Sequence, residues 1–344
     1  MYDHSKPALY LLGLVAAAVI LVATSTFGIG VTAESETYTL AARNMALGHG
    51  LTVFTKAGEP TLLTQHAPLY AALLGTFGRC GIDPIGAARW LSAALFGMTV
   101  LLVGLILKLL CSSVWLPPLG SLFALLSVVL LNLHFTALSE PLFIVCQLAC
   151  LYLLLRFLFT SEIRFLFCAM AACALAVLTR YAGTALVAAG IAGLLLLDRN
   201  TSLRRRAAHA ALFATLSCLP MLLWMAYSAT QTGNPIDRTF GIHFPPPDFY
   251  LAGISALSTW ILPGLVPLEF RLLVLTLAIA MLCAAFRLST SSPPRNYASS
   301  LWHTACFCFL AWPISPSRRF PDRSLTSQSF WTTAFSLHCM HRPC

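Results

Sequence analysis

The sequence has few charged residues. Only 12 of its 344 residues are acidic, and charged residues of both signs make up 10% of the chain, whereas a soluble protein carries about 25%. Hydrophobic residues account for 58%, and the mean hydropathy is +0.80. This composition excludes a water-soluble globular fold, and we expect an integral membrane protein with several spanning helices.

The signatures of several other protein classes are also missing. The formal net charge is +9, but the basic residues stand at the ends of apolar runs, as cytoplasmic anchors do, so no nucleic-acid partner is expected. Most of the 12 cysteines lie inside apolar runs, which is typical of small core residues and not of a disulfide framework. Cys306 and Cys308 lack histidines at a zinc-site spacing. No small-x-small cleavage site precedes Thr32, so we expect the first apolar run to be retained.

Apolar runs of spanning length predict about eight transmembrane helices. The runs cover residues 8–31, 86–110, 114–134, 141–160, 164–180, 182–198, 207–229 and 270–287. Two stretches that are shorter or interrupted by proline, 66–80 and 251–268, are expected to lie at the membrane interface. The predicted fold class is therefore all-α, a polytopic membrane protein with interfacial helices in its first outer loop, residues 32–85.

The basic loops predict an orientation for these spans. Arg204, Arg205 and Arg206 form the densest cationic loop, which the positive-inside rule places in the cytoplasm. Counting spans from this loop puts the N-terminus inside and gathers many charged groups on the outer face. These are Glu34, Glu36, His66, Glu140, Arg180 and Arg238. Because charges in membrane proteins are costly unless they are functional, we predict a polar site at the outer membrane–water boundary.

The last part of the chain follows a different pattern. Residues 288–344 are rich in Ser, Pro, Arg, Cys and His and contain no spanning run or helical period. We expect an irregular tail that is disordered or is the out-of-frame end of a truncated gene, and a disordered tail typically contains fewer Trp, Phe and Cys. The expected organisation is a transmembrane domain over residues 1–287 followed by this tail.

The segment after the first apolar run combines acidic and aromatic residues. Residues with helical spacing along one face are Glu34, Tyr38, Ala41, Ala42 and Met45. They predict an amphipathic helix lying at the interface. The helix dipole favours the ionised form of a carboxylate in the first turn, and such a group can accept a proton from an attacking hydroxyl or amine. A structural alternative is that Ser35 or Glu34 only caps the helix.

Four further outer-face residues have both a functional and a structural interpretation. His66, just before an interfacial helix, can bind an anion or cap that helix. Glu140 can orient a substrate or position a metal, although the preceding Ser139 fits a simple helix N-cap. Arg180 can bind a phosphate through two hydrogen bonds or extend to lipid headgroups. Arg238 lies in a turn-rich loop that can cover a site.

Taken together, these residues resemble the integral-membrane glycosyltransferases of the GT-C fold, in particular the protein-mannosyltransferase and aminoarabinose-transferase-like set. The likeness extends over about residues 8–287 and rests on motifs in this order: Glu34–Tyr38 with Ala42–Met45 and Gly48–Gly50, then His66–Tyr70, Ala87–Ser92, Ser139–Pro141 and Leu178–Gly183. Two departures stand out. Glu34 occupies the position where the family typically has aspartate, and the family usually continues with further spans beyond Leu288.

The resemblance implies a transferase that takes a sugar from a polyprenyl-phosphate carrier at the outer face of the membrane, usually with inversion. The acceptor would be a lipid, a glycan or a protein, and the location would be the bacterial plasma membrane with the site facing the periplasm. The sequence identifies no cofactor with certainty. Two carboxylates on one face permit a divalent metal but do not require one.

The resemblance also implies roles for individual residues. Glu34 would deprotonate or orient the acceptor, and Glu140 would be a secondary acidic residue. The leaving phosphate would be stabilised by Arg180, with help from His66 or Arg238. The substrate-binding set is completed by two aromatic residues, Tyr38 and Tyr70.

Two other functions are compatible with the sequence. One is a transporter or flippase for a lipid-linked substrate, but transporters place ionisable residues near the midplane on broken helices within internal repeats, and no repeat is detectable here. The other is a non-catalytic membrane pseudoenzyme, which is favoured by glutamate at position 34 and by the irregular tail.

Overall fold

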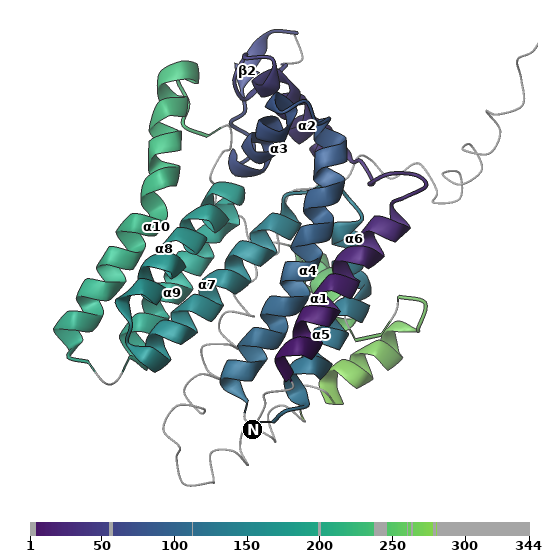
Figure 1. Ribbon diagram of the computed structural model, residues 1–344, viewed down its shortest axis with the longest axis vertical. Coiled ribbons are helices and arrows are strands. Elements are labelled where there is room, and N and C mark those ends of the chain that lie inside the picture. The colour runs from purple at the N-terminus through teal and green to yellow at the C-terminus, as the bar shows by residue number, and fades with distance from the viewer. Residues whose placement is uncertain are drawn as a thin grey trace, which may run out of the picture. The chain divides into compact units, whose positions relative to one another are not determined.

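The computed structural model describes residues 5–54, 58–111, 113–198, 201–236, 246–259, 261–262, 264–277 and 280. Arg238, Cys306, Cys308 and the predicted tail 288–344 lie outside these described residues. The elements in chain order are α1 (Ser5–Ala23), α2 (Ala33–Ala46), β1 (Thr52–Phe54), β2 (Pro60–Leu62), α3 (Leu69–Arg79), α4 (Pro84–Leu110), α5 (Leu116–Leu126), α6 (Val128–His134), α7 (Glu140–Thr160), α8 (Ile163–Thr179), the 3-10 turn η1 (Tyr181–Gly183), α9 (Thr184–Leu197), α10 (Leu203–Thr232) and α11 (Pro247–Ser258). Figure 1 shows their arrangement.

The prediction of a mainly helical membrane protein is confirmed. By length and composition, four of the described helices can cross a membrane, namely α1, α4, α7 and α10, and the bent pair α5–α6 makes a fifth candidate. Two further apolar helices, α8 and the stretch Tyr181–Leu197, are shorter. The predicted span 270–287 is described only at 270–277 and 280, so the total of about eight spans remains a prediction.

One predicted span is broken in the structure. The run expected as a single helix over 114–134 divides into α5 and α6, which meet at an angle of 58°. Ser127 both ends α5 and begins α6, and its side chain accepts a hydrogen bond from the backbone amide of Leu130. A serine in an extended conformation can start a new helix in this way because it supplies its own cap.

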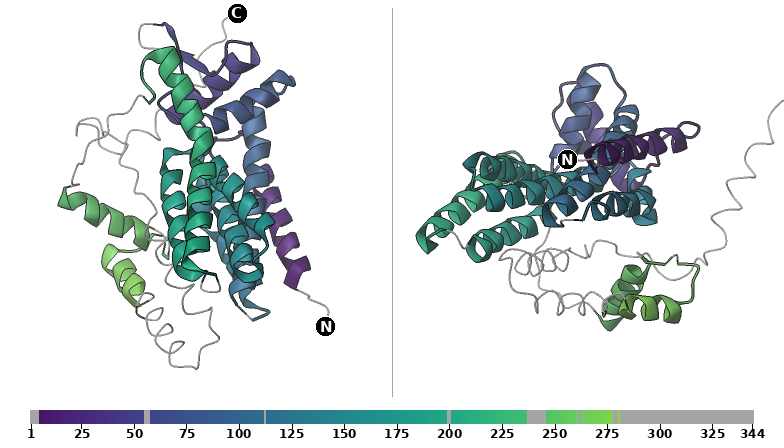
Figure 2. Two further views of the ribbon diagram at one scale, coloured as in Figure 1. Left: turned by 90° about the vertical axis from the view of Figure 1, so that its left-hand side faces the viewer. Right: turned by 60° about the horizontal axis from the view of Figure 1, so that its bottom comes forward.

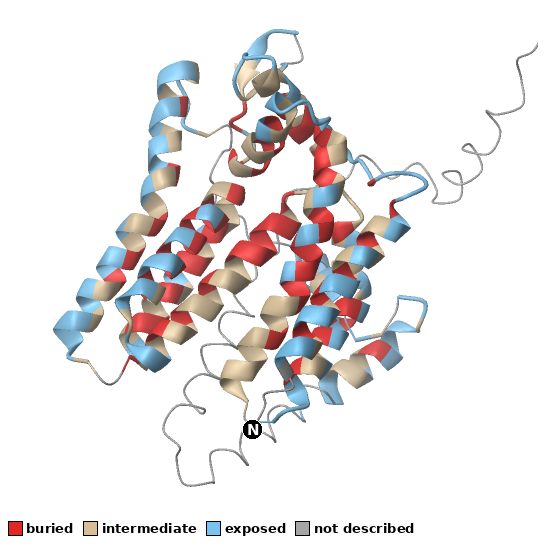
Figure 3. Cartoon of the chain, in the orientation of Figure 1, coloured by how far each residue is buried: buried red, intermediate tan, exposed pale blue. Residues whose placement is uncertain are grey.

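Helix α4 lies between two groups of helices. It packs against α1 and α5 on one side and against α7 on the other, while α7 packs on α8, and α10 packs on both α8 and α9 (Figures 1 and 2). Close approach of α1 and α4 depends on two glycines, because a Cβ atom at Gly97 would lie 2.7 Å from the carbonyl oxygen of Gly13. Residues coloured as buried lie mainly where helices face one another, and exposed residues lie mainly on the outward-facing helix surfaces (Figure 3).

The loop between α1 and α4, residues 32–85 of the sequence, differs from the prediction in two ways. Helix α2 packs against α3 and α4, so Tyr38, Ala41 and Ala42 are buried in protein and do not form a lipid-facing surface at the interface. The loop also contains a short antiparallel hairpin, in which β1 pairs with β2, that the sequence did not predict. As expected from its length, α3 is too short to cross a membrane; it packs on α2, α4 and α8.

Candidate active site

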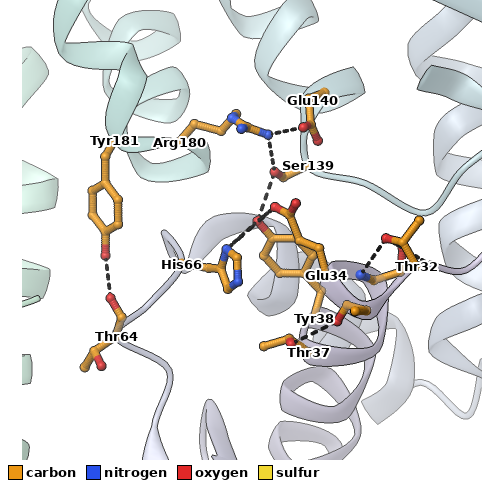
Figure 4. Close-up of polar contacts among 12 residues, drawn as sticks. Thr32, Glu34, Thr37, Tyr38, Thr64, His66, Ser139, Glu140, Arg180 and Tyr181 are labelled. Atoms are coloured by element: carbon orange, nitrogen blue, oxygen red, sulfur yellow. Dashed lines mark hydrogen bonds and ion pairs between the residues drawn. The ribbon is translucent and has the colours of Figure 1, made fainter. Parts of the chain in front are cut away.

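The candidate site lies where the ends of several helices meet the loop between α1 and α4 (Figure 4). Glu34 is in the first turn of α2, and His66 lies between β2 and α3. Glu140 begins α7, and Arg180 follows the last residue of α8. The ends of separate elements thus bring together four residues that are distant in the sequence.

The start of α2 leaves Glu34 available for chemistry. The helix is capped by Thr32, whose hydroxyl accepts from the amide of Ser35, while the Ser35 hydroxyl accepts from the amide of Thr32. This reciprocal arrangement is a capping box. The N-cap residue is therefore Thr32, and Ser35 takes part in the cap, as the structural alternative expected, whereas the structure records no cap hydrogen bond of Glu34. The Glu34 side chain points instead toward Tyr38 and His66 (Figure 4).

Glu34, Tyr38 and His66 form the first half of the site. The phenolic oxygen of Tyr38 lies 3.1 Å from Glu34 Oε1 and 3.4 Å from His66 Nδ1. His66 Nδ1 is also 3.6 Å from Glu34 Oε1. The Glu34 side chain keeps 34% of its surface exposed and the His66 side chain 14%, so a substrate can still reach the carboxylate.

Arg180 and Glu140 form the second half of the site. The Nη1 atom of Arg180 makes an ion pair with Glu140 Oε1 and lies 3.3 Å from the hydroxyl of Ser139. Both side chains are about three-quarters buried, at 23% and 25% exposure. The second carboxylate oxygen, Glu140 Oε2, is buried and has no hydrogen-bond partner among the described residues. A buried carboxylate oxygen without a donor is costly, which makes it a natural contact for a ligand hydroxyl.

Ser139 connects the two halves. As expected, Ser139 occupies the N-cap position of α7 with Pro141 in the first turn, but its side chain makes no cap hydrogen bond. Its hydroxyl oxygen lies 3.0 Å from the phenolic oxygen of Tyr38 and 3.3 Å from Arg180 Nη1. The sequence signal for Ser139 was present in the Ser139–Pro141 motif, but a local cap could not be distinguished from contacts to residues far away in the chain.

Burial controls the ionisation of the two tyrosines. Both Tyr38 and Tyr70 are 2% exposed and pack edge to face with ring centroids 5.2 Å apart. Burial, and then the nearby Glu34 carboxylate, raise the pKa of Tyr38 well above its usual value. Burial and Glu140 do the same to the pKa of Tyr70. Both phenols therefore stay protonated at neutral pH, and Tyr38 acts as a hydrogen-bond donor.

The structure brings together most of the predicted site residues. One network joins the side chains of Glu34, Tyr38, His66, Glu140 and Arg180. Tyr70 lies next to this network because its ring packs against the Tyr38 ring. Glu36, two residues from Glu34 in the same helix, is exposed. In the part of the chain that the structure describes, no group of three or more His, Cys, Asp or Glu side chains is placed to hold a metal ion.

Comparison with known proteins supplies one match. Residues 65–224 match the family described as dolichyl-phosphate-mannose-protein mannosyltransferase, which is a family of GT-C-fold membrane glycosyltransferases that use lipid-linked sugar donors. The matched range contains His66, Tyr70, Glu140 and Arg180, whereas Glu34 precedes it. No curated protein and no solved structure matches the chain.

Proposed function

We propose, on the premise that residues 65–224 belong to the dolichyl-phosphate-mannose-protein mannosyltransferase family, that this integral membrane protein transfers a sugar from a polyprenyl-phosphate carrier to an acceptor. The acceptor is a hydroxyl or amine of a lipid, glycan or protein, and transfer takes place at the outer, periplasmic face of a bacterial plasma membrane. One observation carries the proposal: a carboxylate, Glu34, and a guanidinium, Arg180, are joined by a short chain of hydrogen bonds at the helix ends.

Arg180 binds the phosphate of the donor in this proposal. Its contacts with Ser139 and Glu140 both use Nη1, whereas a guanidinium has five N–H donors arranged as a planar fork. The edge formed by Nε and Nη2 therefore remains for two parallel hydrogen bonds to phosphate oxygens. The same edge stabilises the negative charge that grows on the phosphate as the sugar–phosphate bond breaks.

Glu34 acts as the general base toward the acceptor. Its contacts with Tyr38 and His66 among the described residues use Oε1, so Oε2 is left to accept the acceptor's proton. The acceptor oxygen or nitrogen then forms its bond to the sugar carbon as the phosphate leaves. A base oriented by a fixed hydrogen bond spends less time in unproductive positions, which is the gain that positioning gives to catalysis.

Glu140 holds Arg180 in this account, and the unpartnered Oε2 of Glu140 contacts the donor. The ion pair with Nη1 fixes the guanidinium plane, and the buried Oε2 atom gains a donor when a sugar hydroxyl reaches it. Specificity for a hydroxylated sugar follows, because a substrate without that hydroxyl leaves the carboxylate oxygen unsatisfied.

The location of the charges favours a transferase over a transporter. Transporters place their ionisable residues near the membrane midplane. Here Glu34 lies in the first turn of a short helix outside the spans, Glu140 begins α7, and Arg180 directly follows α8. A site at the ends of helices is reached by a lipid carrier from the bilayer and by an acceptor from water.

A reconstituted transfer assay tests the proposal. The purified full chain in vesicles is supplied with a radiolabelled polyprenyl-phosphate sugar, and release of the sugar from the lipid to an acceptor mixture is measured. Arg180→Lys should raise the KM for the donor by roughly tenfold, because lysine cannot form the two-bonded contact with phosphate. Arg43→Lys is the matched control, since Arg43 is exposed and paired with Asp83. A wild-type chain that releases no sugar, or an Arg180→Lys variant with unchanged donor KM, would contradict the proposal.

A further inference from the structure

The proposed function assigns no role to Ser139, although this residue touches both halves of the site. Resting on the proposed function, we infer that Ser139 is a positioning residue whose hydroxyl aligns the base Glu34, through Tyr38, with the phosphate-binding guanidinium of Arg180. Nothing in the family match assigns such a role to this serine. This role rests on the burial of Ser139, on its distances to Tyr38 and Arg180, and on which of these groups can donate a hydrogen bond.

Ser139 is completely buried, with 0% of its surface exposed. Its hydroxyl is 3.0 Å from the Tyr38 phenol and 3.3 Å from Arg180 Nη1, and it gives no cap to α7. Because Ser139 has no exposed surface, it does not contact the substrate directly. Its side chain bridges α2 and the end of α8 from its place at the start of α7 (Figure 4).

Ser139 accepts hydrogen bonds from both halves of the site. A guanidinium can only donate, so the N–H of Arg180 donates to Ser139 Oγ. The Tyr38 hydroxyl donates to the same serine oxygen and also to Glu34 Oε1, so its single proton is shared between these two acceptors. Ser139 must therefore accept from two donors, which alanine cannot do at all and a thiol does only weakly.

This arrangement gives Ser139 two effects on the reaction. It helps to hold the guanidinium in the orientation that presents Nε and Nη2 to the donor phosphate. It also accepts from the Tyr38 hydroxyl, which holds the phenol in contact with Glu34 Oε1. Loss of the hydroxyl is therefore expected to lower kcat and raise the donor KM together, whereas loss of side-chain volume alone would not.

Three substitutions separate the hydroxyl from the volume of the side chain. Ser139→Ala removes the hydroxyl, Ser139→Cys nearly keeps the volume but offers only a weak acceptor, and Ser139→Thr keeps the hydroxyl while adding a methyl group. We expect kcat to fall by about tenfold in the alanine and cysteine variants, the size of effect for a lost hydrogen bond involving a charged group, and to recover in the threonine variant. Ser121→Ala is the matched control, since Ser121 is equally buried and bonds a backbone carbonyl in α4; its kcat should not change.

Two results would overturn the inference. One is a series in which kcat depends on side-chain volume, so that Ser139→Cys has the kcat of the wild type and Ser139→Thr has the lowest kcat. The other is a wild-type kcat in Ser139→Ala. A second test uses the background Tyr38→Phe. If Ser139 acts on Glu34 through Tyr38, Ser139→Ala should cost kcat little more in that background, because the two effects are not independent; full additivity contradicts the role.

One readout does not need activity, so failure of the proposed function is distinguishable from failure of this inference. The C–O stretching band of Tyr38, isolated as the infrared difference between the wild type and Tyr38→Phe with ring-labelled tyrosine, should shift in Ser139→Ala and Ser139→Cys and return in Ser139→Thr. A band that is the same in all of these proteins would show that Tyr38 does not donate to Ser139, whether or not the chain transfers sugar.

Discussion

Tyr181 donates its phenolic hydroxyl to the backbone carbonyl of Thr64, with an O–O distance of 3.0 Å. The two residues lie next to each other at one edge of the site (Figure 4); Tyr181 directly follows Arg180, and Thr64 lies two residues before His66. The contact ties the turn after α8 to the loop between β2 and α3. It therefore sets the position of His66 relative to Arg180 without either of those side chains taking part.

Removing this tie should weaken catalysis more than stability. Tyr181→Phe keeps the ring and deletes one hydrogen bond, so we expect kcat to fall by about fivefold, in line with a net worth of about 1 kcal/mol, while the midpoint of thermal unfolding changes little. Steady-state kinetics and circular dichroism measure the two quantities. Tyr227→Phe is the matched control because Tyr227 is 51% exposed. A Tyr181→Phe variant with wild-type kcat would separate this contact from the site.

The packing of α1 on α4 gives a prediction about stability. Gly97→Ala would place a Cβ atom 2.7 Å from the Gly13 carbonyl oxygen, and because this neighbour is backbone, the two helices must move apart. We expect a destabilisation of about 1–3 kcal/mol, which is typical of overpacking. Gly86→Ala in the same helix meets nothing within 4 Å and should be neutral or stabilising, since alanine is the better helix former. Thermal unfolding in detergent compares the two variants; equal midpoints would contradict the close contact.

The buried phenol of Tyr38 predicts an alkaline limit to stability. Burial, followed by Glu34, raises the pKa of Tyr38 in the folded protein, whereas an unfolded tyrosine has a pKa of about 10. Since the folded state holds the proton more tightly, this contribution to stability is complete below about pH 10 and is lost as the pH rises further. Tyr38→Phe should therefore lose less stability than the wild type between about pH 10 and 11. Parallel losses in the two proteins would show that Tyr38 does not contribute.

The sequence predicted the location of the site better than its internal contacts. Glu34, His66, Glu140 and Arg180 were grouped because the positive-inside rule and the lengths of the apolar runs place them at one boundary, and the structure brings them together. Tyr70 was assigned to substrate binding, a role that remains a prediction; the structure places it behind Tyr38. Its burial could not be deduced from spacing, because α2 and α3 pack on each other and not on lipid.

Three features could not be predicted for physical reasons. The β1–β2 hairpin has strands of three residues each, too short for a periodic pattern. The break at Ser127 contains neither proline nor glycine, so nothing in the apolar run indicates it. The residue type of Ser139 fits an N-cap, but its side chain contacts Tyr38 and Arg180, which are 101 and 41 residues away in the sequence. Contacts between distant parts of the chain therefore determine where this side chain points.

The most direct test of the central claim, that Glu34 is the base of a sugar transferase, is the rate of transfer from a polyprenyl-phosphate sugar by Glu34→Gln, with Glu36→Gln as control. Glutamine keeps the size of the side chain and cannot accept the proton, and Glu36 is an exposed carboxylate two residues away in the same helix. We predict that Glu34→Gln lowers kcat by at least about a hundredfold, the usual contribution of a general base, and that Glu36→Gln transfers at the wild-type rate. Full activity of Glu34→Gln beside an active wild type would contradict the claim.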